Sequence, residues 1–254
     1  MTDMRIPRIA VTLGDPAGIG TEIALRAIQD PDVTSSLTPV LFGSAEVVAR
    51  EIRRAGHDLE VSLVTPATAG PAISGIVQVV PTSGAEALIP YGVVAAAGGE
   101  AAVSAVRAAV LSTMAGDVDA ICTAPLNKES LRLAGYPFDG HTEMLAAYTD
   151  HSAVTMLLIG RRLRVAHLTT HTSIRQVPDK ITPDRLRFVI AIAHRLLQEY
   201  GIAAPRIAVA GLNPHAGENG LFGDEEQTVM RPVIEEMRLR GHDIVGPISP
   251  DAVF

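Results

Sequence analysis

The stretch RIAVTLGDPAGIG, residues 8–20, decides the fold class of this chain. Its first half is a short apolar run typical of a strand, and GDPAGIG is too rich in glycine and proline to continue that strand. A helical pattern follows over residues 21–28. The loop is not a dinucleotide fingerprint or a P-loop, because its glycines are wrongly spaced and no Gly-Lys-Ser/Thr follows. It is either a plain strand-to-helix turn or a helix N-terminus that receives an anion.

The same alternation of strand and helix patterns continues along the chain. Thr182-Pro183 is a clear helix start, an N-cap followed by proline at the first helical position. Further strand patterns lie at residues 40–43, around Val61 and Val77, and at 120–124, 153–159, 163–169 and 206–212, and helical patterns at 44–55, 98–114, 182–200 and 224–239. Repeated strand–helix units predict a largely parallel sheet with helices on both faces.

Composition narrows the class of protein. Apolar residues make up 47% and charged residues 19% of the 254 residues, which is typical of a folded chain with a sizeable core. The net charge of −7 and the absence of a Lys/Arg run with interleaved aromatics argue against a nucleic-acid partner. The single cysteine, Cys122, excludes an internal disulfide and is expected to be a buried strand residue. We find no signal peptide or membrane-spanning run, and we expect a cytoplasmic protein.

Three histidines follow predicted strands or open helices. His215 lies in GLNPHAGENG directly after a strand, His171 ends a strand in LTTH, and His141 opens a helix in GHTE. Loops at the carboxyl ends of parallel strands are where open α/β proteins bind ligands. Imidazoles brought together there can hold a divalent metal, although a lone loop histidine more often only hydrogen-bonds its own turn.

Two other segments, at residues 123–129 and 246–254, carry further signals. TAPLNKE places Lys128 at a strand-to-helix junction, where it is either near the ligand edge or simply a solvated lysine. The last residues, 246–254, form a loop pattern that leads into an apolar run and stops at Phe254. We therefore expect a chain that is truncated after Phe254.

Taken together, five strings resemble the 4-hydroxythreonine-4-phosphate dehydrogenase family, which includes 4-phospho-threonate dehydrogenases. The resemblance runs along the whole chain in order. The strings are GDPAGIG (14–20), TAPLNKE (123–129), GHTE (140–143), TTH (169–171) and GLNPHAGENGLFGDEE (211–226).

The resemblance implies an α/β fold similar to isocitrate and isopropylmalate dehydrogenases, with two interleaved α/β domains around a central cleft within residues 1–254 and uncertain boundaries. It implies a homodimer with its active site near the subunit interface. It also implies oxidation of a small phosphorylated hydroxy acid by NAD or NADP at a divalent metal (Zn, Mg or Co), as in pyridoxal 5'-phosphate biosynthesis. In the family, the positions of His171 and His215 hold the metal, and those of His141 and Thr142 contact substrate. A third metal histidine and the phosphate site belong to strings that this sequence lacks, so part of the C-terminal region is expected to be missing.

Chemistry supplies a role for each part. The metal would lower the pKa of the substrate hydroxyl while hydride leaves for the nicotinamide, and the β-keto acid formed can lose CO2. A base must take the hydroxyl proton, and the candidates are Lys128, Asp251 and His141. Two alternatives stay open, a related dehydrogenase for an aromatic cis-dihydrodiol acid and a non-catalytic fragment of the same fold.

Overall fold

The chain divides into two compact units in a computed structural model that describes residues 5–84, 89–151 and 153–254. The first unit comprises Met1–Ser152 and the second Ala153–Phe254. Within the described residues, no helix is long and apolar enough to cross a membrane. The interleaved domains and the isocitrate dehydrogenase-like arrangement stay predictions.

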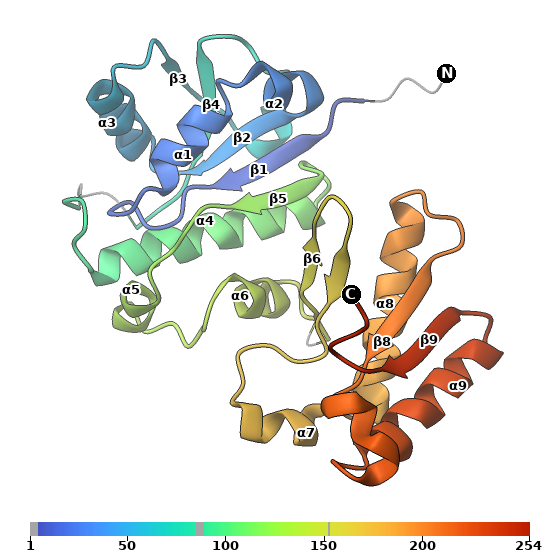
Figure 1. The fold of residues 1–254 in the computed structure, drawn as a ribbon. Helices are drawn as coiled ribbons and strands as arrows, with labels where there is room; N and C mark the ends of the chain where they lie inside the picture. The colour runs from blue at the N-terminus through green and yellow to red at the C-terminus, as the bar shows by residue number, and fades with distance from the viewer. Residues whose placement is uncertain (1–4, 85–88, 152) are drawn as a thin grey trace. The chain divides into compact units, whose positions relative to one another are not determined.

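The first unit is built on a parallel five-stranded sheet with the order β3-β4-β2-β1-β5 (Figure 1). The strands are β1 Arg8–Thr12, β2 Thr38–Gly43, β3 Glu60–Leu63, β4 Ile76–Pro81 and β5 Ala120–Thr123. The helices are α1 Gly20–Ala27, α2 Pro31–Ser36, α3 Ala45–Ala55, α4 Ala96–Met114, α5 Lys128–Leu133 and α6 His141–Tyr148. Every strand and long helix expected here from the sequence is therefore confirmed.

Helices cover both faces of this sheet, as Figure 1 shows. Leu41 and Val79 face one way and pack with Leu25 of α1 and Val48 of α3. Phe42, next along β2, faces the other way, in the cluster to which α4 contributes Ala105 and Ala109. Alternate residues of one strand point to opposite faces, so a nearly all-apolar strand such as β2 requires both covers.

The second unit contains two separate strand pairs. Strands β6 Leu157–Ile159 and β7 Arg164–Ala166 form an antiparallel hairpin, and β8 Arg206–Ala210 and β9 Asp243–Ile248 pair in parallel. The helices are α7 Val177–Lys180, α8 Pro183–Glu199 and α9 Arg231–Leu239, the last preceded by a π-helical segment, Glu226–Met230. Their apolar faces enclose the core around Ile190, Ile234 and Ile244. The basic segment at residues 161–164, which leads from β6 into β7, is exposed.

Two expectations about local structure are wrong. Cys122 is exposed, because β5 is an edge strand of the described sheet and its side chain lacks a cover. Residues 246–248, expected as loop, are the end of β9, which pairs with β8 as far as Ala210 and Ile248. A strand that contains Gly-Pro is stabilised by its pairing partner rather than by its own propensity, so the local pattern could not indicate it.

Candidate active site

Two sequence motifs meet at the carboxyl edge of the first sheet. The loop after β1 begins at Gly14, and the loop after the neighbouring strand β5 contains Pro125. Asp15 N donates a hydrogen bond of 3.2 Å to Pro125 O. Gly14 has φ +68°, and a Cβ atom there would lie 2.1 Å from Pro125 O. Only glycine permits the backbone of residue 14 to lie this close to Pro125 O. The GDPAGIG and TAPLNKE loops therefore pack directly against each other.

A buried carboxylate lies inside this junction. Asp15 is 5% exposed; its Oδ1 accepts a 2.9 Å hydrogen bond from Ala17 N, and its Oδ2 accepts one of 3.0 Å from the Ser130 hydroxyl. Sequence reasoning missed Asp15 and Ser130 as partners. The signal was an acidic residue inside a glycine loop, which needs donors from another segment once it is buried.

The third motif of this unit, GHTE, lies against the same loop. His141 opens α6 after Gly140, and its ring donates a hydrogen bond to the backbone of Ala124. Its Nε2 is buried and has no partner, so the donating atom is Nδ1. Burial lowers the pKa of His141, and the bond to Ala124 only partly opposes this. The ring is therefore a neutral imidazole that offers the Nε2 lone pair as an acceptor.

The neighbours of His141 extend this polar edge. Thr142 is half-buried beside it, and Oε2 of Glu143 is buried without a hydrogen-bond partner. Lys128 is the first residue of α5, after Asn127, whose Oδ1 accepts from Ser130 N at 2.9 Å. The lysine is exposed at the helix start. The first unit thus brings Lys128, His141 and Thr142 to the segment that follows β5.

In the second unit, the two predicted metal ligands share an unusual backbone conformation. His171 has φ +48° and His215 has φ +52°, and both side chains are exposed. The non-glycine residues with positive φ among those described are Asp150, His171, His215, Ala216, Glu218 and Asn219. Such a conformation costs about 1 kcal/mol or more per residue and persists where surrounding contacts enforce it, often at functional sites.

The turn that carries His215 is anchored by Glu226. This side chain is fully buried; its Oε1 accepts a 2.7 Å hydrogen bond from Asn213 N, and its Oε2 accepts one of 3.0 Å from Asn213 Nδ2. Burial alone would raise the pKa of Glu226, but the hydrogen bonds from Asn213 and from nearby backbone amides outweigh it and lower the pKa. Sequence reasoning did not single out Glu226, although its GDEE string belongs to the same motif.

Asp251, a candidate base, lies within electrostatic reach of His215. The Ser249 hydroxyl and its own backbone amide donate hydrogen bonds to the Asp251 carboxylate and lower its pKa, and the charge of His215 adds to this effect. Gly211 N donates a 2.7 Å bond to Ile248 O, which ties the loop after β8 to the end of β9. His215 and Asp251 therefore lie in the segments that follow β8 and β9, and the two segments are joined by this bond.

His171 and His215 can supply two metal ligands, which are too few for a complete metal centre. His171 and His215 are loop imidazoles, the donor type that suits zinc and cobalt. Among the residues that the structure describes, however, no three His, Cys, Asp or Glu side chains are arranged to hold a metal ion. The assignment of these two histidines stays a prediction.

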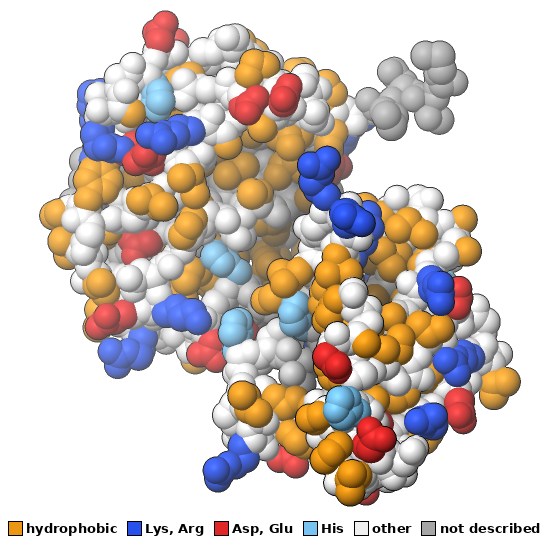
Figure 2. All heavy atoms as spheres, viewed as in Figure 1, with side chains coloured by type: hydrophobic (Ala, Val, Ile, Leu, Met, Phe, Trp, Pro, Cys, Tyr) orange, Lys and Arg blue, Asp and Glu red, His pale blue; other side chains and the backbone are white. Residues whose placement is uncertain are grey.

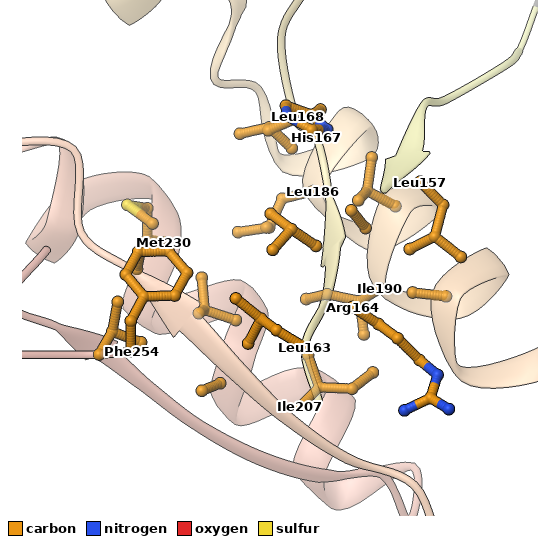
Figure 3. Close-up of a pocket in the computed structure, with 18 of the residues that line it drawn as sticks. Leu157, Leu163, Arg164, His167, Leu168, Leu186, Ile190, Ile207, Met230 and Phe254 are labelled. Carbon is orange, nitrogen blue, oxygen red and sulfur yellow. The ribbon is translucent and has the colours of Figure 1, made fainter. Parts of the chain in front are cut away.

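A large pocket in the second unit is not this site. It encloses about 630 Å³, and Leu163 of the hairpin, Ile190 of α8, Ile207 of β8 and Phe254 are among the side chains that line it (Figure 3). Apolar side chains also lie on the visible face of this unit (Figure 2). None of the predicted site residues lines the pocket.

Comparison with known proteins connects the geometry to a family. The family model described as pyridoxal phosphate biosynthetic protein PdxA matches residues 35–254. The D-threonate 4-phosphate dehydrogenase of Cupriavidus necator is 39% identical over 250 residues, which are 98% of this chain and 75% of the relative.

Solved structures agree with this match. The 4-hydroxythreonine-4-phosphate dehydrogenase of Klebsiella pneumoniae has a TM-score of 0.88 at 40% identity, covering 100% of this chain and 77% of that one. The terephthalate 1,2-cis-dihydrodiol dehydrogenase of Burkholderia xenovorans has a TM-score of 0.67 at 33% identity, covering 98% and 75%.

Proposed function

The chain belongs to the family of the pyridoxal phosphate biosynthetic protein PdxA, and on this premise we propose that it oxidises the secondary hydroxyl of a small phosphorylated hydroxy acid. It is a dehydrogenase that acts on a CH–OH group. The candidate substrates are 4-phosphohydroxy-threonine and 4-phospho-threonate, named for the relatives on which the proposal rests. The electron acceptor is NAD or NADP, and the β-keto acid product then loses CO2.

One observation carries the proposal more than any other. The imidazole of His141 is neutral and bonded to the backbone of Ala124, and its buried Nε2 has no hydrogen-bond partner. An acceptor with a set orientation suits a substrate hydroxyl, which must be held before its proton and hydride leave. Thr142, adjacent in the same helical turn, adds a hydroxyl that can donate to substrate oxygen.

The proton from the substrate hydroxyl goes to a base, for which Lys128 and Asp251 are our candidates. The lowered pKa of Asp251 keeps this carboxylate charged, but it also makes Asp251 a weaker base than an ordinary carboxylate. Lys128 acts as a base only where its ammonium is deprotonated, and otherwise attracts the substrate's negative charges. The dependence of activity on pH distinguishes these two roles of Lys128.

We propose His171 and His215 as ligands of a divalent cation, supported by their exposure, their shared positive φ and the family motifs. A divalent cation bound to a substrate hydroxyl lowers the pKa of that hydroxyl. The proposal includes a homodimer with its active site near the subunit interface, which rests on the family resemblance, and a cytoplasmic location, for which the single cysteine is the supporting observation.

A substrate panel tests the proposal. The purified chain is mixed with NAD or NADP and a divalent cation, and formation of reduced nicotinamide is followed with each phosphorylated acid and with an aromatic cis-dihydrodiol acid. We expect reduction with a phosphorylated acid. Reduction with the dihydrodiol alone would favour the second candidate, for which the Burkholderia xenovorans structure is the supporting observation. No reduction with any of them would favour a non-catalytic protein.

A further inference from the structure

The turn that carries His215 is left-handed over five successive residues. Residues 215–219 have φ values of 52°, 52°, 79°, 43° and 56°, and only Gly217 among them lacks a Cβ atom. L-residues visit this region as single residues and do not form such a run on their own. Contacts from outside the turn must therefore hold it.

Glu226 supplies such contacts. Its carboxylate accepts hydrogen bonds from both the backbone N and the side-chain Nδ2 of Asn213, two residues before His215. The turn itself closes over the same carboxylate, because a Cβ on Gly217 would lie 2.8 Å from Glu226 Oε2. Gly211, at the start of the loop, also lies close to this carboxylate, because a Cβ added there would lie 3.2 Å from Glu226 Oε1.

The carboxylate in turn depends on the loop. Glu226 is fully buried, and within the described residues no Lys, Arg or His side chain forms an ion pair with it. A buried charge without a counter-ion is tolerated only when hydrogen-bond donors surround it. Here the donors are Asn213 and backbone amides, including that of Leu212. Loop and carboxylate therefore hold each other in one arrangement.

We infer that Glu226 is a positioning residue, whose buried carboxylate holds the left-handed turn that carries His215. The ligand role of His215 rests on the proposed function, whereas the positioning of its ring does not. The competing explanation is that Glu226 only stabilises the fold of the second unit, with no specific effect on His215.

The test uses Glu226→Gln, which keeps the shape of the side chain but places an NH2 group against a donor of Asn213. The matched control is Glu51→Gln, because Glu51 is also a buried carboxylate, bonded to Arg54 and Tyr91 in the first unit. Asn213→Ala is the milder second variant, since it keeps the backbone bond to Glu226 Oε1 and removes only the bonds of Nδ2, one to Glu226 and one of 2.8 Å to Glu225 Oε2. The NMR signal of the His215 imidazole, assigned by its loss in His215→Ala, is recorded in metal-free protein well below the melting temperature. Backbone hydrogen exchange over residues 211–219 is measured on the same samples.

We expect the His215 signal to shift or broaden and the loop amides to lose protection in Glu226→Gln, and to a smaller extent in Asn213→Ala, while Glu51→Gln changes neither. Cobalt affinity should fall by about tenfold or more in Glu226→Gln, in line with the loss of supporting contacts around a metal ligand. An unchanged His215 signal and unchanged loop protection in a folded Glu226→Gln protein would overturn the inference. If His215→Ala leaves cobalt affinity unchanged, the ligand assignment fails, but the imidazole signal still decides the positioning role.

Discussion

The hydroxyl of Ser130 donates a 3.0 Å hydrogen bond to Oδ2 of Asp15, across 115 positions of sequence. Both residues are buried, and they join the glycine loop after β1 to the helix that follows β5. The bond fixes the distance between the glycine loop and α5, which follow neighbouring strands at the same edge of the sheet. The geometry of this edge therefore depends on contacts that no local pattern contains.

Ser130→Ala should lower the free energy of unfolding by about 2 kcal/mol, because a buried carboxylate loses a donor. Urea unfolding measures the change. Ser112→Ala is the control: Ser112 is also buried, but its hydroxyl bonds only to Ala108 O within α4. We expect the control to lose less than about 1 kcal/mol. Equal losses for the two variants would mean that the bond to Asp15 has no special weight.

Gly14→Ala should destabilise the first unit much more than Gly56→Ala. The two glycines have almost the same φ, +68° and +67°, but a Cβ at Gly56 would meet nothing within 4 Å. Gly56→Ala therefore measures the backbone cost alone, about 1 kcal/mol. Gly14→Ala adds the collision with Pro125 O and should cost about 1–3 kcal/mol more. Similar melting temperatures for both variants would show that the loops after β1 and β5 separate without penalty.

His141 should make the protein less stable as the pH falls. Burial lowers its folded-state pKa below the ordinary value of 6.5, so the unfolded chain binds this proton first. The contribution of the neutral ring is complete above about pH 6.5 and is lost progressively as the pH falls toward the folded-state pKa. The difference in unfolding free energy between the wild type and His141→Gln should therefore shrink below about pH 6.5. At pH 8 this difference measures only the effect of the substitution that does not depend on protonation of His141. If the difference in unfolding free energy stays constant with pH, the ring of His141 is not buried as described.

Substitution of His215 by glycine should change metal affinity and stability in opposite directions. His215→Gly relieves the positive φ of the imidazole-bearing residue, so the free energy of unfolding should rise by up to about 1 kcal/mol. The same variant should lose cobalt affinity, as should His171→Gly, measured by isothermal titration. His151→Ala, which removes an exposed histidine from the first unit, serves as the control. Retention of cobalt affinity by both glycine variants would reject the two ligands.

Sequence reasoning succeeded where a signal is local. The alternation that starts at Arg8–Thr12 predicted the parallel sheet, and the Thr182 cap accepts a hydrogen bond from Arg185 N, as its position before Pro183 indicated. It failed where the pairing of strands determines the structure. Examples are Cys122, which is exposed on an edge strand, and the end of β9.

The same division applies to the site. His141, His171 and His215 were predicted because they end strands or open a helix, and the positive φ of the last two was not visible in the sequence. Asp15 and Glu226 were missed because their importance comes from burial against partners in other segments. Whether the predicted ligands and bases act as proposed stays a prediction.

The most direct test of the proposed function follows the hydrogen itself. Phosphorylated substrate carrying deuterium at the carbinol carbon is turned over with NAD or NADP, and the nicotinamide product is analysed by mass spectrometry. A dehydrogenase of this kind should place the deuterium on the nicotinamide ring and release CO2 from the oxidised acid. Reduced nicotinamide without deuterium, or no reduced nicotinamide with either phosphorylated acid, would contradict the account.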